Sequence, residues 1–333
     1  MRLSGRGGRP GRVVVAGVAV LGLLGTLAAC GTEEDEPAVE SGTADPRPPE
    51  PPGEAELAEA AEEFEALEDE FDARLGVYAL DTGSGGEIAH RDDERFAYAS
   101  TFKALLVGAV LDAHGTDGIE EVVDYTEDEL VDYSPVTENF VDSGMSLSQL
   151  SAATLWYSDN TAANLLLDAV GGPDGLQEAL REMGDDTTEV SRYEPELNEA
   201  TPGDTRDTST PRAMADDLRA LLLEDALGER ERHLLRQWME TNTTGGTLVE
   251  AGLPAEWTVA DKSGSAGYGG RNDIAVVWPD DGGDPIVLAV LSSRDEEDAE
   301  RDDALVARAA TVAVTALGRL DPADSDPRVD AGD

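Results

Sequence analysis

Hydrophobic residues recur every three to four positions between residues 55 and 73, a spacing that predicts an amphipathic helix. Two shorter apolar runs follow, at 75–80 and 87–90, on either side of a turn rich in glycine. Runs of this length around such a turn predict the two strands of a hairpin. The chain then returns to helical spacing from residue 101 to about residue 235, in segments that glycine and proline interrupt.

Strand-like runs return near the C-terminal end, at 257–262, 273–278 and 286–291, and a last helical pattern spans 299–317. Strands next to both chain ends suggest one antiparallel sheet that is built from both ends and flanked by helices. The middle of the chain, about 97–239, would form a separate helical lobe. We therefore expect an α+β fold with a cleft between the two parts, a common place for a binding site.

The segments outside this pattern differ in composition from the rest. Residues 1–29 combine four arginines with an apolar stretch, which predicts an export signal. Residues 30–54 are acidic and rich in proline and are predicted to be a tether, and the acidic residues 321–333 are predicted to be a disordered tail. Residues 55–320 remain as one large folded domain.

The chain carries 72 acidic residues against 24 lysines and arginines, a net charge of −48. Loss of residues 1–29 removes four arginines and no acids, which makes the charge −52. Because such a surface repels nucleic acid and anionic lipid headgroups, we expect neither as an electrostatic partner. Cys30 is the only cysteine, which excludes a disulfide within the chain.

Only two of the 333 residues are lysines, and both lie in short polar motifs. A buried lysine can lose its proton and act as a base, whereas arginine stays charged. A chain that otherwise uses arginine retains lysine where that chemistry is needed, so the two motifs are candidates for a catalytic site. They are Ser100-Thr101-Phe102-Lys103 and Lys262-Ser263-Gly264.

Ser100 and Lys103 stand three residues apart at the start of an apolar helical run, so both side chains would lie on one helix face. A serine hydroxyl becomes a nucleophile when a neighbouring base takes its proton. Lys103 would be that base if burial and nearby cations lower its pKa. Taken alone, the motif also fits Ser100 as a helix N-cap.

A third motif, Ser158-Asp159-Asn160, precedes the apolar run 161–167 and by itself predicts a helix cap. The order of the three motifs, S-x-x-K, S-D-N and K-S-G, resembles that of the penicillin-recognising serine enzymes. This superfamily includes class A β-lactamases and penicillin-binding proteins.

A fourth segment separates those two groups. It resembles the Ω-loop of class A β-lactamases, including a glutamate, Glu194, and an asparagine, Asn198. The resemblance spans about 55–320, and a fifth motif at 268–276 agrees with it. The chain is thus identified as a member of the class A serine β-lactamases, with the fold of the β-lactamases and transpeptidases.

The resemblance implies a set of catalytic roles. Ser100 would attack the lactam carbonyl, and Lys103, Glu194 or both would accept its proton. Glu194 would later activate the water that hydrolyses the acyl-enzyme. Ser158 would pass a proton to the departing lactam nitrogen, and Lys262 would stabilise the charge state of Ser158. Backbone N–H groups of Ser100 and Ser265 would form the oxyanion hole.

The resemblance also implies substrate-binding and structural residues. An ion pair between Arg192 and Asp207 would clamp the ends of the Ω-loop, and the Glu194–Pro195 bond would be cis. The substrate carboxylate would be bound by Lys262, Ser263 and Arg271. The small-molecule β-lactam substrate and its hydrolytic water would be held by Tyr133, Asn160, Asn198, Ser263, Gly264, Ser265 and Arg271.

Two other functions use the same motifs. A D,D-peptidase or penicillin-binding protein would acylate the same serine, and a non-hydrolytic β-lactam-binding lipoprotein would remain acylated. Glu194 with Asn198 favours hydrolysis, because the pair supplies the deacylating water. The three histidines show no metal-binding spacing, so we expect no metal and no other cofactor. We also expect a monomer.

The export signal ends at Leu27-Ala28-Ala29-Cys30, which resembles the lipobox of bacterial lipoproteins. The resemblance implies that Cys30 is lipidated and that acyl chains hold the exported protein on the outer face of the cytoplasmic membrane, with some of it released. The alternative is a plain secretory signal with an incidental cysteine.

Overall fold

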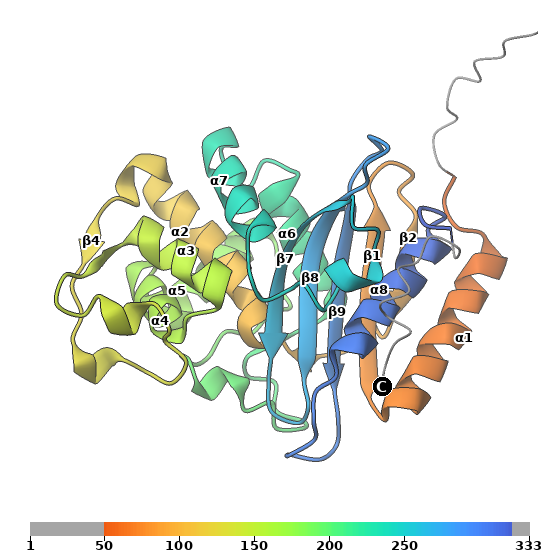
Figure 1. Cartoon of the computed structure of the whole chain (residues 1–333), viewed down its shortest axis with the longest axis horizontal. Coiled ribbons are helices and arrows are strands. Elements are labelled where there is room, and N and C mark those ends of the chain that lie inside the picture. Colours follow the sequence, from red (N-terminus) through yellow and green to blue (C-terminus); the bar gives the residue numbers. More distant parts are fainter. Residues whose placement is uncertain (1–49, 322–333) are drawn as a thin grey trace, which may run out of the picture. The chain divides into compact units, whose positions relative to one another are not determined.

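The structure is a computed structural model that describes residues 50–321. The export signal, Cys30, most of the tether and nearly all of the acidic tail therefore lie outside the described residues. Within this range, one antiparallel sheet of five strands has the order β2-β1-β9-β8-β7 (Figure 1). Its strands are β1 (Arg74–Asp81), β2 (Glu87–His90), β7 (Thr258–Ser265), β8 (Arg271–Trp278) and β9 (Ile286–Ser293).

The sheet joins both ends of the chain, as predicted. β1 pairs with β9 along its whole length, from Arg74 opposite Ser293 to Asp81 opposite Ile286. The strands read as continuous apolar runs because both faces of the sheet are covered. Successive residues of one strand belong to different cores: Val77 packs in the core beneath the terminal helices, and Tyr78 packs in the core of the helical lobe.

The terminal helices α1 (Glu54–Phe71) and α8 (Asp303–Ala316) cover one face of the sheet (Figure 1). The prediction that the last helix begins at residue 299 is wrong. The helix begins four residues later because the Asp302 carboxylate accepts a hydrogen bond from the Ala304 backbone N–H and caps it there.

The other face carries the helical lobe. Its central helix α2 is buried on nearly every side from Phe102 to Leu111, which explains why its sequence lacks a polar face. None of the described helices is both long and apolar enough to span a membrane. The helices of the lobe are α2 (Phe102–Gly118), α3 (Leu147–Tyr157), α4 (Asn160–Ala169), α5 (Gly172–Met183), α6 (Pro211–Leu222) and α7 (Glu229–Glu240).

Two short pairs of strands stiffen the loops beside this lobe. β3 (Phe96–Ala97) pairs with β6 (Thr208–Ser209), and β4 (Val122–Val123) pairs with β5 (Met145–Ser146). The first pair brings the segment before Ser100 next to the segment that ends the predicted Ω-loop. Segments that lie far apart in the sequence thus meet beside the turn that carries Ser100.

Candidate active site

Ser100 lies in a 3-10 turn, η1 (Ala99–Thr101), that leads into α2. The φ angle of Ala99 is +49°, a left-handed conformation that non-glycine residues rarely adopt. Ser100 is not the cap of either helical segment, so the alternative N-cap role is wrong. Its hydroxyl instead donates to Glu194 Oε1 over 3.4 Å.

The edge strand β7 lies directly against this turn. An added Cβ at Gly264 would be 2.9 Å from the Tyr98 carbonyl oxygen and 3.1 Å from the Thr101 backbone nitrogen, so only glycine permits this approach. Asn272 on β8 supports the same turn, because its side-chain amide donates to the Ala97 carbonyl over 2.8 Å. The sequence analysis missed Asn272, which lies beside the predicted Arg271.

The Lys103 ammonium is fully buried beneath the cleft. It donates to the Ser158 carbonyl at 2.8 Å and to Asn160 Oδ1 at 2.6 Å, and it lies 2.9 Å from Glu194 Oε1. Burial lowers the pKa of Lys103 below its ordinary value, and this effect outweighs the opposing attraction of Glu194 and Asp159. The geometry therefore gives Lys103 the environment that a proton-transfer lysine requires.

Ser158 stands between the only two lysines of the chain. Its Oγ lies 3.3 Å from Lys103 Nζ and 3.3 Å from Lys262 Nζ. A left-handed backbone at Ser158, with φ of +57°, ends α3 and turns the hydroxyl toward the cleft. Burial, followed by repulsion from Lys103, lowers the pKa of Lys262 to about 7.

Asp159 is the buried support of this motif, and the sequence analysis gave it no role. Its Oδ1 accepts from the Ala162 N–H at 2.8 Å, which caps α4. Its Oδ2 accepts from the backbone N–H groups of Val136 and Thr137. The loop that carries Tyr133 is thereby attached to the start of α4, where Asn160 accepts a hydrogen bond from Lys103.

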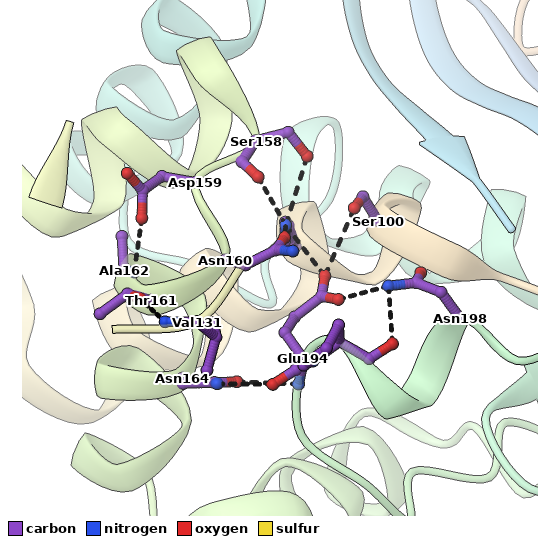
Figure 2. A network of polar contacts seen from close by, with 12 residues as sticks. Ser100, Val131, Ser158, Asp159, Asn160, Thr161, Ala162, Asn164, Glu194 and Asn198 are labelled. Atoms are coloured by element: carbon purple, nitrogen blue, oxygen red, sulfur yellow. Dashed lines mark hydrogen bonds and ion pairs between the residues drawn. The ribbon is translucent and has the colours of Figure 1, made fainter. Parts of the chain in front are cut away.

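Glu194 lies between Asn160 and Asn198, and its carboxylate points toward Ser100 (Figure 2). Its carboxylate is buried; Oε1 faces Ser100 and Lys103, and Oε2 accepts a hydrogen bond from the Asn198 amide. Within the described range, the Asn198 carbonyl oxygen Oδ1 is buried and accepts no hydrogen bond. An acceptor of this kind fits a ligand that donates hydrogen bonds, such as water.

The backbone of Glu194 is held by Asn164, which the sequence analysis missed. Asn164 Oδ1 accepts from the Glu194 N–H at 2.9 Å, and its amide donates to the Glu194 carbonyl at 2.8 Å (Figure 2). The signal was the spacing: Asn164 follows Asn160 by one helical turn, so both face the same side of α4. The Glu194–Pro195 bond is cis, as expected.

The predicted Arg192–Asp207 ion pair is present at the ends of the Ω-loop. Arg192 Nε lies 2.5 Å from Asp207 Oδ2, and the fully buried Asp207 also accepts from the backbone N–H of Ser191 and of Arg192. The Tyr98 hydroxyl donates to the same carboxylate at 3.2 Å. One carboxylate thus joins both ends of the loop to the segment before Ser100.

These groups surround a cleft of about 350 Å³. It is lined by all seven predicted substrate-binding residues, by Ser100 and Ser158, and by two residues that the sequence analysis missed, Thr244 and Arg301. Thr244 accepts a hydrogen bond from the Ser263 hydroxyl at 2.8 Å. Lys103, Glu194 and Lys262 lie buried beneath this lining.

One predicted substrate-binding residue is already engaged. Arg271 donates from Nε to Asp303 Oδ1 at 2.6 Å and from Nη1 to the Ser265 hydroxyl at 2.9 Å. The motif Lys262-Ser263-Gly264 lies within β7 and does not end it, because pairing with β8 continues to Ser265 opposite Arg271. The strand therefore presents these residues along the wall of the cleft.

The arrangement suits acyl transfer. A serine hydroxyl lies next to a carboxylate and close to a buried lysine, and a second hydroxyl connects that lysine to another. Groups of this kind can pass a proton away from a nucleophile and on to a leaving group. The carboxylate, with an amide beside it, can also activate water.

Comparison with known proteins agrees with this chemistry. The model of the "Beta-lactamase enzyme family" matches residues 59–317. A β-lactamase of Amycolatopsis lactamdurans is 58% identical over 256 residues, which cover 77% of this chain and 84% of the relative. A β-lactamase of Bacillus licheniformis is 54% identical over 255 residues, with coverages of 77% and 83%.

Solved structures give the same answer. A halotolerant bacterial β-lactamase superposes with a TM-score of 0.76 at 54% identity and covers 77% of this chain and 98% of its own. A class A β-lactamase from Clostridium kluyveri DSM 555 has a TM-score of 0.77 at 45% identity, with coverages of 78% and 99%. The chain therefore belongs to the β-lactamase enzyme family, as a serine β-lactamase of class A.

Proposed function

We propose that this class A enzyme hydrolyses the β-lactam ring of penicillins and cephalosporins through an ester on Ser100, which a water activated by Glu194 then cleaves. This activity confers resistance to these antibiotics. The observation that carries the mechanism is the position of Glu194. Its buried carboxylate faces the nucleophile with one oxygen and the Asn198 amide with the other.

In the acylation step, Ser100 Oγ attacks the lactam carbonyl carbon and Glu194 Oε1 accepts its proton. Glu194 is favoured over Lys103 as the immediate acceptor, because the Ser100 hydroxyl already donates to it. Lys103, 2.9 Å from the same oxygen, passes a proton to Ser158, and Ser158 protonates the nitrogen as the carbon–nitrogen bond breaks. Glu194 then returns its proton to Lys103, so the relay is balanced.

The oxyanion that forms during both steps would be stabilised by the backbone N–H groups of Ser100 and Ser265. The close approach of β7 to η1 at Gly264 supports this assignment, because it brings the end of the edge strand next to the nucleophile. Removing one such donor typically costs about 10²–10³ in rate.

In the deacylation step, Glu194 removes a proton from water, and the resulting nucleophile attacks the ester. Asn198 supports this step with its amide on Glu194 and with its free, buried carbonyl oxygen. The ester breaks, Ser100 regains a proton from Glu194, and the ring-opened acid leaves. A penicillin-binding protein lacks such a water and remains acylated.

The test is Glu194→Gln. An amide cannot accept the proton of water, so we expect turnover to fall by at least about 10³ while a covalent adduct accumulates on Ser100, detected by intact-protein mass spectrometry. Glu196→Gln changes an exposed glutamate of the same loop and serves as the matched control. Parental turnover by Glu194→Gln would remove Glu194 from the mechanism.

We also propose that the mature enzyme is monomeric and is held on the outer face of the cytoplasmic membrane by lipid on Cys30, with some of it released. A monomer would suffice for the proposed chemistry, because that chemistry assigns no role to a residue of a second chain. The anchor is supported by the lipobox-like residues 27–30 after an apolar stretch.

A further inference from the structure

The wall of the cleft that would receive the substrate carboxylate is less positive than its residues suggest. Arg271 is paired with Asp303, so the two side chains together carry no net charge. A β-lactam that bears its ring carboxylate is an anion, and a protein of charge −48 repels it. A cation without an acidic partner at this wall would therefore have a large effect on substrate capture.

Arg301 lies at this wall, in the loop before α8, and lines the same cleft as Ser100 and Arg271. It is exposed, and among residues 50–321 it forms no hydrogen bond and no ion pair. The carboxylate of Asp303 is close enough to attract Arg301 electrostatically, but the hydrogen bonds it accepts come from other residues. Its Oδ1 accepts from Arg271, and its Oδ2 accepts from the Thr247 hydroxyl.

The acidic neighbours of Arg301 in the chain are directed elsewhere. Asp302 caps α8 through the Ala304 N–H, and neither Asp302 nor Glu300 lines the cleft. Arg301 therefore presents its guanidinium donors to the cleft with no acidic side chain bound to them. Guanidinium binds carboxylate through two parallel hydrogen bonds, a geometry that a single ammonium does not offer.

We propose that Arg301 is a specificity-determining residue that captures the ring carboxylate of β-lactam substrates, beside Arg271 and Lys262. The inference rests on the proposed hydrolytic function. Arg301 acts on binding and encounter, not on bond making, and its contribution is greatest at low ionic strength because Arg301 is exposed. Burial lowers the pKa of Lys262 to about 7, so Lys262 is mostly uncharged above neutral pH. The share of carboxylate binding that depends on Arg301 is then larger.

The experiment compares Arg301→Gln, Arg301→Lys and the parent with a penicillin at low salt, about 20 mM, and at high salt, about 500 mM. Arg230→Gln is the matched control, since Arg230 is an exposed arginine on α7 that does not line the cleft and its loss changes the net charge equally. For Arg301→Gln we expect kcat/KM to fall about threefold to tenfold at low salt, mainly through KM. The loss of kcat/KM should be smaller at high salt. Arg301→Lys should retain part of the kcat/KM that Arg301→Gln loses.

A penicillin whose carboxylate is esterified distinguishes capture from a structural effect. The Arg301→Gln variant should hydrolyse the ester at the parental rate. The inference is overturned if Arg301→Gln lowers kcat/KM equally for the ester and for the acid. It is also overturned if Arg230→Gln lowers kcat/KM as much as Arg301→Gln does. Absence of turnover in the parent would instead overturn the proposed function, so the two failures remain distinguishable.

Discussion

At the scale of single residues, the site depends on two buried lysines that contact different kinds of group. Lys103 contacts a carboxylate, whereas Lys262 contacts the Ser158 hydroxyl and the Ser263 carbonyl oxygen, both neutral groups. Burial with too little compensation explains why the pKa of Lys262 falls to about 7. The ammonium of Lys262 is therefore charged below neutral pH and becomes neutral above it.

This titration predicts a pH-dependent KM. As the pH rises through about 7, Lys262 loses its charge, so KM for a carboxylate-bearing penicillin should rise several-fold between about pH 6 and pH 8.5. In Lys262→Arg the guanidinium stays charged, and this rise should disappear. Steady-state kinetics across that range check the prediction, with thermal unfolding to verify the fold. A rise that persists unchanged in Lys262→Arg would assign it to another group.

At the scale of elements, β7 and β8 bury two carboxyl groups beside each other behind the site. Asp261 and Asp273 are both fully buried, and each has one oxygen without a hydrogen-bond partner in the described structure. Desolvation raises the pKa of Asp261 to about 6 and that of Asp273 well above its ordinary value. The folded state therefore holds protons that the unfolded chain releases near pH 4.

The free energy of unfolding therefore depends on pH in a definite direction. Because the folded-state pKa values are raised, this stabilisation is complete below about pH 4 and is lost as the pH rises through about 6 for Asp261 and through the raised pKa of Asp273. In Asp273→Asn the amide stays neutral and donates to Asp261, so we expect the free energy of unfolding at pH 8 to rise by about 1–2 kcal/mol. Urea unfolding at pH 5 and pH 8 measures this change, with Asp280→Asn, an exposed site two residues beyond the end of β8, as control. Destabilisation by Asp273→Asn at pH 8 would contradict it.

The elements also show where prediction from sequence ends. The strands and the terminal helices were predictable because apolar period and length are local properties, and the three motifs indicated the site. The conformation around Ser100 was not, since β7 and Asn272 impose it from the other end of the chain. Arg301 was also missed, because only the fold brings that loop to the cleft.

At the scale of the whole molecule, charge governs where the enzyme can be held. A chain of net charge −48 gains nothing from anionic lipid headgroups, and its described helices do not span a membrane. The attachment proposed above would rest on acyl chains on Cys30, and stable attachment requires more than one acyl chain.

Cys30→Ala should therefore move most of the activity from the membrane fraction to the soluble fraction, with kcat unchanged. Fractionation followed by penicillin hydrolysis measures this, and Thr32→Ala is the control. Retention of the Cys30→Ala protein on membranes would show that another segment anchors it.

The pairing of β1 with β9 also has a consequence for the timing of folding. β1 is complete at Asp81, but its neighbour in the sheet begins at Ile286 and ends at Ser293. A growing chain therefore cannot close its central sheet until most of it has been made, and contacts of such high sequence separation form slowly. The sheet is therefore complete, and the cleft beside β7 fully formed, only after β9 has been synthesised. Such late closure would leave the chain unfolded during the export proposed above.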